Sequence, residues 1–240
     1  MTFEITIPVL NEEETLAQQI RILLRFLNEN FPQKNQWKIV IADNGSIDDT
    51  WAICLRLAAE NETIRLVQTE KRGVGLALKT SWESSNAAVV GYMDLDFATD
   101  LKHFREVIQL IENQEVEFVY GTRLHKNSEV IGRSLKREFT SRAFNFIVSK
   151  YLKTNFSDGM CGFKFLKREK LDILLKSGAV SDGWFFSTEL LATAEWNNLK
   201  IHELPVKWTD DEASKVKIFK LAKEYLQAMY YLRNRKIGLT

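Results

Sequence analysis

The chain contains little cysteine, and it lacks any long apolar run. Its 240 residues include two cysteines, Cys54 and Cys161, and no CxxC or cysteine–histidine spacing accompanies them. This argues against a disulfide framework or a zinc site and indicates a reducing compartment. No apolar run approaches the ~20 residues that cross a bilayer, and the N-terminus lacks the basic and apolar segments of a signal peptide. We therefore expect a protein that is soluble or lies on a surface.

An excess of charge of one sign is also missing. The net charge is +1, from 33 basic and 32 acidic residues, which argues against a protein that coats nucleic acid. The sequence has no repeats, no low-complexity segment and no linker rich in Gly, Pro or Ser. Hydrophobic residues make up 45% of the chain, enough for a substantial core. These features predict one domain over residues 1–240.

The first half alternates short apolar runs with helical patterns. Asn11 and Ser46 are predicted N-caps, with Glu14 and Asp49 at the capping-box positions. Alternation of this kind predicts an α/β fold with a doubly wound, mostly parallel sheet. The predicted strands are 5–9, 38–42, 64–68 and 87–93, and the predicted helices are 11–27, 46–60 and 74–84.

The second half has a different character, because basic residues are concentrated in it. Three strands are predicted, at 118–122, 163–166 and 201–208, together with helices at 134–151, 184–196 and 216–235. From 215 to 236 seven residues are Lys or Arg and only Glu224 is acidic. This terminal amphipathic helix fits either packing onto the core or contact with anionic lipid, and amphipathicity alone does not separate the two. A second basic cluster comprises Arg133, Lys136, Arg137 and Arg142.

Polar residues directly after the strands are the candidates for a binding site, because ligands of doubly wound sheets bind beyond the carboxyl ends of the strands. Asp94 and Asp96 are two apart on an extended segment, so both carboxylates can point to one side. Such a pair suits Mg²⁺ or Mn²⁺ and, through the ion, a diphosphate. A solvated turn is the alternative, but the position after a buried strand favours the metal. Asp43 follows the second strand and can bind a base or a ribose, or simply belong to a capping loop.

These residues resemble glycosyltransferase family 2, with its GT-A fold, and in particular its dolichyl-phosphate glucosyltransferase and dolichol-phosphate mannose synthase branch. The resemblance covers nearly the whole chain. It is carried by the segments 8–12 (PVLNE), 43–50 (DNGSIDDT), 94–96 (DLD), 121–123 (GTR), 134–137 (SLKR), 141–142 (SR), 158–164 (DGMCGFK), 205–208 (PVKW) and 214–216 (SKV).

The resemblance implies a role for each matching residue. A nucleotide-sugar-binding half is expected at 1–122 and an acceptor-binding half with basic helices at 123–240. The nucleotide would be bound by Pro8, Glu12 and Asp43. The sugar nucleotide and the metal would be bound by Asp94 and Asp96. The acceptor phosphate would be met by Arg123, Arg137 and Ser141, and the donor phosphates by Lys215.

The implied reaction is transfer of a hexose from a nucleotide sugar to a polyprenyl phosphate at the cytosolic face of a membrane. A phosphate is already anionic near neutral pH, so one in-line displacement with inversion needs no strong base. Ala98 stands where mannose synthases usually have Gln, and Thr209 stands where they have Arg. Both departures favour UDP-glucose over GDP-mannose as the donor.

Two other functions fit the same residues. A saccharide or protein hydroxyl as acceptor must lose a proton, which would make a carboxylate base such as Asp158 essential. A non-catalytic module would bind the nucleotide sugar without turning it over, and the Asp94/Asp96 pair with Arg123 and Arg137 makes this the weakest of the three.

Overall fold

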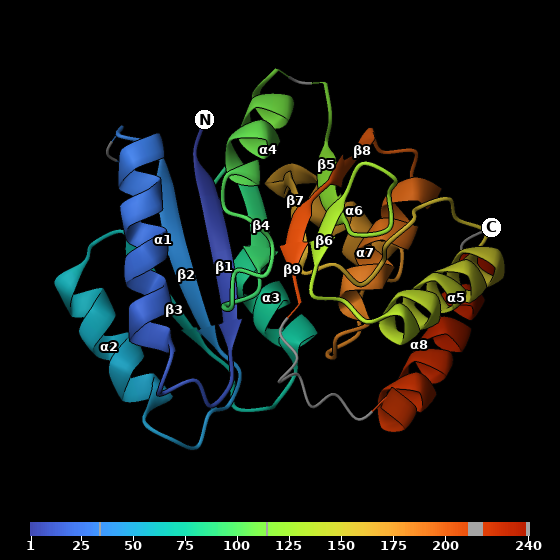
Figure 1. The fold of residues 1–240 in the computed structure, drawn as a ribbon, viewed down its shortest axis with the longest axis horizontal. Helices are drawn as coiled ribbons and strands as arrows, with labels where there is room; N and C mark the ends of the chain where they lie inside the picture. Colours follow the sequence, from blue (N-terminus) through green and yellow to red (C-terminus); the bar gives the residue numbers. More distant parts are fainter. Residues whose placement is uncertain (34, 114, 211–217, 239–240) are drawn as a thin grey trace.

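The chain folds around a seven-stranded sheet (Figure 1). The computed structural model describes residues 1–33, 35–113, 115–210 and 218–238. The strand order is β3-β2-β1-β4-β7-β5-β8, and β6 and β9 form a second, two-stranded sheet. The strands are β1 Phe3–Val9, β2 Trp37–Asp43, β3 Ile64–Gln68, β4 Val89–Met93, β5 Phe118–Thr122, β6 Glu129–Ile131, β7 Phe163–Lys167, β8 Ile201–Pro205 and β9 Lys207–Thr209.

Most neighbouring strands of the large sheet are parallel, which confirms the predicted mostly parallel α/β fold. The exception is β7, which runs antiparallel between β4 and β5. The predicted single strand 201–208 is two strands in different sheets. After Pro205 the chain makes one more bond to β5, from Val206 N to Thr122 O, and then leaves to pair with β6.

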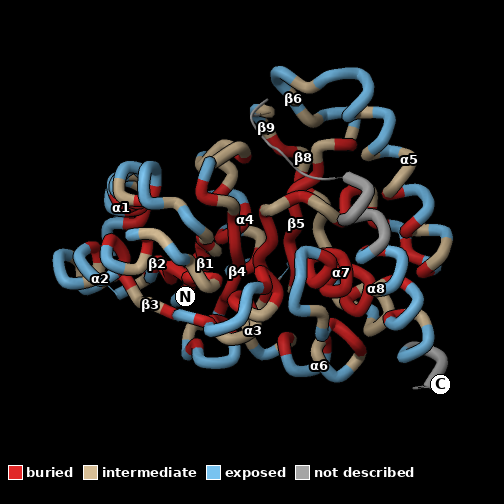
Figure 2. The backbone as a smooth tube through the Cα atoms, turned by 90° about the horizontal axis from the view of Figure 1, so that it is seen from below, coloured by how far each residue is buried: buried red, intermediate tan, exposed pale blue. Residues whose placement is uncertain are grey.

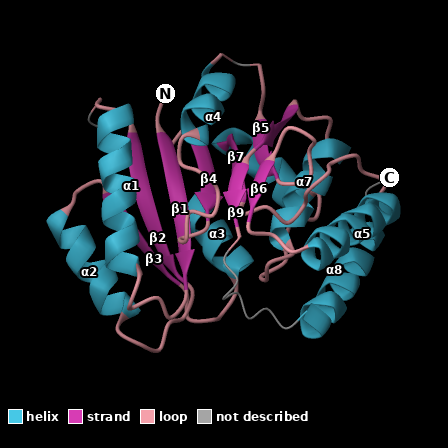
Figure 3. Ribbon diagram, viewed as in Figure 1, coloured by secondary structure: helices cyan, strands magenta, loops and turns pink. Residues whose placement is uncertain are grey.

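Helices cover both faces of the sheet (Figure 3). One apolar cluster contains side chains of α1, α2 and α4, and another contains those of α3, α5, α6, α7 and α8. Strand residues alternate between the clusters: Val89 and Met93 belong to the first, Val90 and Tyr92 to the second. The helices are α1 Leu16–Asn30, α2 Thr50–Glu60, α3 Val74–Glu83, α4 His103–Glu112, α5 Leu135–Leu152, α6 Leu171–Lys176, α7 Phe186–Trp196 and α8 Ile218–Gly238, with a 3-10 turn at Arg168–Lys170.

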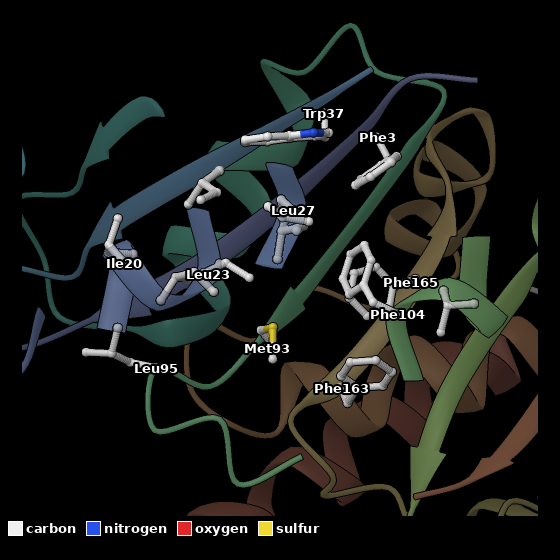
Figure 4. Close-up of a cluster of buried hydrophobic side chains, with 14 of the residues drawn as sticks. Phe3, Ile20, Leu23, Leu27, Trp37, Met93, Leu95, Phe104, Phe163 and Phe165 are labelled. Atoms are coloured by element: carbon white, nitrogen blue, oxygen red, sulfur yellow. The ribbon is translucent and has the colours of Figure 1, made fainter. Parts of the chain in front are cut away.

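An aromatic group anchors the first cluster at the middle of the sheet. Phe104 of α4 lies edge-on to Phe165 of β7, with ring centroids 4.9 Å apart, and Phe3 lies 5.5 Å from Phe104 (Figure 4). The sheet carries the buried centre of the molecule, and the exposed residues lie mainly on the outer helices and loops (Figure 2). Helix α4 was not predicted, although its buried side chains at 104, 107, 108 and 111 have helical spacing.

The two predicted N-caps are wrong. Asn11 has a left-handed backbone, with φ of 55°, and α1 begins only at Leu16. Ser46 lies four residues before Thr50, where α2 begins. Neither helix has a side-chain cap in the structure. The polar side chains of these loops instead make contacts between the loops, described below.

The terminal helix packs onto the core and also exposes apolar side chains. Tyr225, Met229 and Leu232 of α8 are buried, and Tyr225 lies 5.5 Å from Phe144 of α5. Leu226 and Tyr230 are exposed. None of the helices in the described ranges is long and apolar enough to cross a membrane.

The packing of β4 against β7 gives a stability prediction. A Cβ atom at Gly91 would lie 1.9 Å from Cδ1 of Phe165, a side chain held between other rings. We expect Gly91→Ala to lower the free energy of unfolding by about 1–3 kcal/mol, measured by urea denaturation. Gly183→Ala is the control, because nothing lies within 4 Å of its Cβ position. Equal stability of the two variants would contradict this packing.

Candidate active site

The first part of the site lies at the carboxyl ends of β1, β2 and β4, which are neighbours in the sheet (Figure 1). Pro8 pairs with Ala42 and Val9 pairs with Asp43. On the other side of β1, Thr6 pairs with Tyr92, so Asp94 follows at the level of Pro8. The sheet thus brings Pro8, Asp43 and Asp94 to one edge, as expected from the sequence.

Two loops at this edge are bonded to each other by reciprocal contacts. The Asn11 N–H donates to Ser46 Oγ at 3.0 Å, and the Ile47 N–H donates to Asn11 Oδ1 at 2.9 Å. The Glu12 N–H donates to Thr50 Oγ1 at 2.8 Å, so Thr50 fixes the backbone next to the predicted nucleotide ligand. The side chain of Glu12 is half-buried and accepts from Thr15 Oγ1. Local capping signals in the sequence therefore serve tertiary contacts.

Asp43 is fully buried beneath these loops. Its carboxylate accepts hydrogen bonds from Ser46 N and Gln68 Nε2, both at 3.1 Å. Its neighbour Asn44 accepts from the Gly73 N–H through Oδ1, which ties the end of β2 to the start of α3. Asp43 therefore holds the loop after β2 and the side chain of Gln68 in place. Any contact with a nucleotide would be additional to this structural role.

Asp94 lies deeper than Asp96 in the segment after β4. Asp94 is half-buried, whereas Asp96 is exposed and accepts from Ala98 N at 2.9 Å. A Cβ atom at Gly162 would lie 1.9 Å from Asp94 Oδ2, so only glycine fits beside this carboxylate. Burial and the nearby Asp96 raise the pKa of Asp94 to about 7, against the opposing pull of Arg123.

The acidic pair has the properties of half a divalent cation site. The Asp94 carboxylate accepts no hydrogen bond from the described residues, so its oxygens remain available as ligands although the charges of Arg123 and Lys164 act on it. No group of three or more His, Cys, Asp or Glu side chains in the described ranges could hold a metal. Mg²⁺ commonly takes only one or two carboxylates and completes its oxygen shell with substrate phosphates and water. Asp94 and Asp96 therefore fit an ion that is shared with a diphosphate.

The second part of the site is built on Arg123, at the end of β5. Its Nε lies 2.7 Å from Asp158 Oδ2 and its Nη2 lies 2.9 Å from Oδ1. The Arg123 N–H also donates to Asp158 Oδ2, at 3.1 Å. Asp158 is fully buried, and Arg123 holds the pKa of its carboxyl at about 2 despite that burial. The guanidinium is thus fixed in plane and orientation.

The turn 158–162 connects the two parts. Its glycine Gly162 abuts Asp94, while Asp158 pairs with Arg123. Lys164 is fully buried and donates from Nζ to the carbonyls of Gly159, at 3.1 Å, and Cys161, at 2.6 Å. Burial lowers the pKa of Lys164 to about 8. One turn thus lies against both Asp94 and Arg123, which the sequence interpretation expects to be close together.

The arginines that follow β5 lie around Trp208 of β9. Arg123 lies over the Trp208 ring at 5.1 Å and Arg133 lies over it at 5.8 Å. Arg133 donates through Nη2 to Ser141 Oγ of α5. Arg137 is more exposed, and its Nη1 lies 2.7 Å from Asp210 Oδ1. Ser141 and Arg123 are thus linked through Arg133 and the indole.

Three site residues were not assigned a role from the sequence. In the sequence Arg133 stands out only as part of a basic cluster. Lys164 and Trp208 stand out only as members of the segments 158–164 and 205–208, which carry the family resemblance. A buried lysine in a strand carries no periodic signal, because its position looks like a surface position of β7 until the sheet order is known. The predicted donor-phosphate ligand Lys215 lies outside the described residues.

The chain is similar to known glycosyltransferases. The family Glycosyl transferase family 2 matches residues 4–174. The chain is 32% identical over 213 residues to Glycosyltransferase AglD of Haloferax volcanii, covering 88% of this chain and 34% of AglD. It is 28% identical over 239 residues to Dolichyl-phosphate beta-glucosyltransferase ALG5C of Trichomonas vaginalis, covering 95% and 70%. The chain thus spans about a third of the length of AglD and 70% of the length of ALG5C.

A structural comparison agrees on the fold. Glucosyl-3-phosphoglycerate synthase from Mycobacterium tuberculosis, in complex with Mn²⁺, uridine diphosphate and phosphoglyceric acid, superimposes with a TM-score of 0.68. Its sequence is 17% identical, and the match covers 98% of this chain and 78% of the synthase. This likeness shows a GT-A nucleotide-sugar transferase fold. With more than half of its length matched by the family, the chain belongs to glycosyltransferase family 2.

Proposed function

We propose that this protein transfers a hexose, favoured as glucose from UDP-glucose, to the phosphate of a polyprenyl phosphate at the cytosolic face of a membrane. The observation that supports this most directly is a single site that contains a carboxylate pair and, beside it, a fixed guanidinium. The turn 158–162 contacts both Asp94 and Arg123. Relatives named dolichyl-phosphate beta-glucosyltransferases support the same acceptor class. GDP-mannose is the other donor considered.

The residues divide the work between donor and acceptor. Pro8, Glu12 and Asp43 would line the nucleotide end, and Asp94 with Asp96 would hold the divalent ion. Such an ion, when bound, neutralises charge on the departing diphosphate. Arg123, with Arg137 and Ser141, would orient the acceptor phosphate so that one of its oxygens faces the anomeric carbon. The new carbon–oxygen bond forms as the bond to the diphosphate breaks, with inversion.

A hydroxyl acceptor is disfavoured by the state of Asp158. A general base near neutral pH needs a pKa close to that pH and a free oxygen aimed at the substrate. Asp158 has a pKa of about 2, is fully buried, and uses both carboxylate oxygens on Arg123. It is a positioning residue for Arg123 and is poorly suited to accept a proton. A phosphate acceptor requires no such base.

Helix α5 offers a surface for the membrane. Leu135, Phe139 and Phe146 are 88%, 75% and 62% exposed, and their spacing places them on one side of the helix. Arg142 follows Phe139 on the same side and is also exposed. Helix α8 packs beside α5 and exposes Leu226 and Tyr230. An apolar strip interspersed with basic residues is typical of a helix that lies at a lipid interface.

The metal proposal predicts loss of transfer when the acidic pair is changed. Asp94→Asn should lower the rate of hexose transfer at least ~100-fold, because charge on the diphosphate would lose its stabilisation. EDTA should abolish transfer, and Mn²⁺ or Mg²⁺ should restore it in the unchanged protein only. The assay offers UDP- and GDP-sugars with a polyprenyl phosphate and reads product stereochemistry. Asp172→Asn, an exposed carboxylate of α6, is the control. Full activity of Asp94→Asn in EDTA would refute the metal site.

The assignment of Asp158 predicts a pH-dependent stability difference. Its folded pKa of about 2 lies below the ordinary value of 3.8, so its contribution is fully present above about pH 4 and is lost as the pH falls toward 2. Asp158→Asn should cost about 3–5 kcal/mol at pH 7, because Arg123 is left buried and unpaired. The difference from the unchanged protein, measured by urea unfolding at pH 7, 5, 4 and 3, should shrink only below about pH 4. A difference that is independent of pH over this range would count against the pair.

The membrane proposal predicts weaker binding to anionic vesicles when the α5 strip is made polar. Leu135→Ser with Phe139→Ser should lower partitioning about tenfold in co-sedimentation. Leu55→Ser is the control, since Leu55 is 50% exposed on α2, away from this surface. Transfer to a short, water-soluble acceptor should stay unchanged in the double variant. Equal vesicle binding by all three proteins would remove α5 from the interface.

A further inference from the structure

Arg133 is a largely enclosed cation close to Arg123 and the first candidate for a further ligand. Its side chain is 6% exposed, and it precedes α5 on the segment after β6. Nη2 donates to Ser141 Oγ, and the guanidinium lies over Trp208. The buried Nη1 makes no hydrogen bond with the described residues, although it lies 3.1 Å from Glu138 Oε2. Nη1 thus has a counter-ion but no aligned hydrogen bond, an arrangement that a better-placed partner would improve.

The charges around Arg133 indicate what that partner is. Arg123 lies over the same indole, and its own counter-ion is Asp158. Burial and the charge of Arg123 lower the pKa of Arg133. Glu138 is divided between two cations, because its Oε1 lies 2.6 Å from Arg142 Nε. Asp158 and Asp210 also act on Arg133, so a further partner of this guanidinium is an anion that competes with carboxylates already present.

Glu138 is placed where it can give way to an external anion. It lies in the first turn of α5, and its side chain is 29% exposed. Rotation of that side chain toward solvent would leave α5 intact and uncover Nη1 of Arg133. A phosphate group offers more acceptor oxygens and more charge than the carboxylate it would replace.

We propose that Arg133 is a ligand of the acceptor's phosphate group, and that Glu138 is its resident counter-ion, which the acceptor displaces. This inference rests on the proposed phosphate acceptor. It adds a competition within the protein: Glu138 keeps Arg133 oriented while the acceptor is absent and opposes its binding. Ser141, besides its proposed contact with the phosphate, and Trp208 would hold Arg133 in place.

The proposal predicts effects of opposite sign at neighbouring positions. Arg133→Met should raise the acceptor KM and weaken acceptor binding about 10- to 100-fold, because a charged hydrogen bond is lost. Glu138→Gln should tighten acceptor binding about two- to fivefold, because a competing ion pair is removed. The KM for the nucleotide sugar should stay unchanged in both variants. A gain in affinity cannot arise from partial unfolding.

Matched controls separate these effects from general changes in charge. Glu106→Gln removes a carboxylate from the first turn of α4, just as Glu138→Gln does in α5. Arg105→Met removes an exposed cation of α4. Neither should alter acceptor binding. Thermal unfolding, measured for all four variants, shows whether each protein remains folded.

The assay uses a short, water-soluble polyprenyl phosphate, with inorganic phosphate as a second probe, in both turnover and calorimetric binding. Unchanged acceptor binding in Arg133→Met, or weaker binding in Glu138→Gln, would overturn the inference. Turnover without these shifts would reject the inference and leave the proposed function standing. The expected shifts in acceptor binding without any turnover would support the role of Arg133 and reject the proposed transfer reaction. Equal affinity for inorganic phosphate would mean that the site recognises the phosphate group alone.

Discussion

The ion pair of Arg123 with Asp158 is the interaction on which the rest of the site depends. It joins the end of β5 to the turn 158–162 through two side-chain bonds and one backbone bond. A buried ion pair adds little net stability, because desolvation offsets most of the attraction, but it strongly disfavours any arrangement that separates the charges. Its contribution here is to fix the guanidinium in one orientation.

The turn that Asp158 begins is also a junction for three elements. The Gly159 N–H donates to Asn145 Oδ1 of α5 at 2.8 Å, Lys164 of β7 holds the carbonyl of Cys161, and Gly162 lies against Asp94 after β4. Helix α5 is therefore bonded to the same turn that lies against Asp94. The sequence suggests residues 1–122 as the donor-binding half and 123–240 as the acceptor-binding half. The two halves are in contact at this turn, where Gly162 lies against Asp94. The proposed function requires such closeness, because the hexose passes directly between two phosphates.

Local sequence signals predicted the sheet well and the loops poorly. The strands β3 and β5 are predicted at their observed bounds. For β5 the reason is burial on both faces, which leaves a run that needs no tertiary information. Asn11 and Ser46 are residue types that often cap helices, but here each bonds to the other's loop. These bonds form because β1 and β2 are neighbours, which brings the two loops together. The reversed direction of β7 likewise depends on partners far away in the sequence, 70 to 78 residues in β4 and 44 to 48 residues in β5. Arg133 could not be distinguished from its basic neighbours, since its burial depends on Trp208.

Asp94 and Asp158 show how one fold gives two carboxylates different tasks. Both are enclosed, and burial raises the pKa of each. Asp158 receives two guanidinium bonds, so its pKa falls to about 2 and it stays charged as a fixed partner of Arg123. Asp94 receives no such bonds from the described residues and lies near Asp96, so burial and Asp96 raise its pKa to about 7 against the pull of Arg123 and Lys164. Environments that push the pKa values of neighbouring acids apart are a mark of divided function. The carboxylate that accepts no hydrogen bond from the described residues is therefore the one suited to a metal and a diphosphate, while Asp158 holds Arg123 beside it.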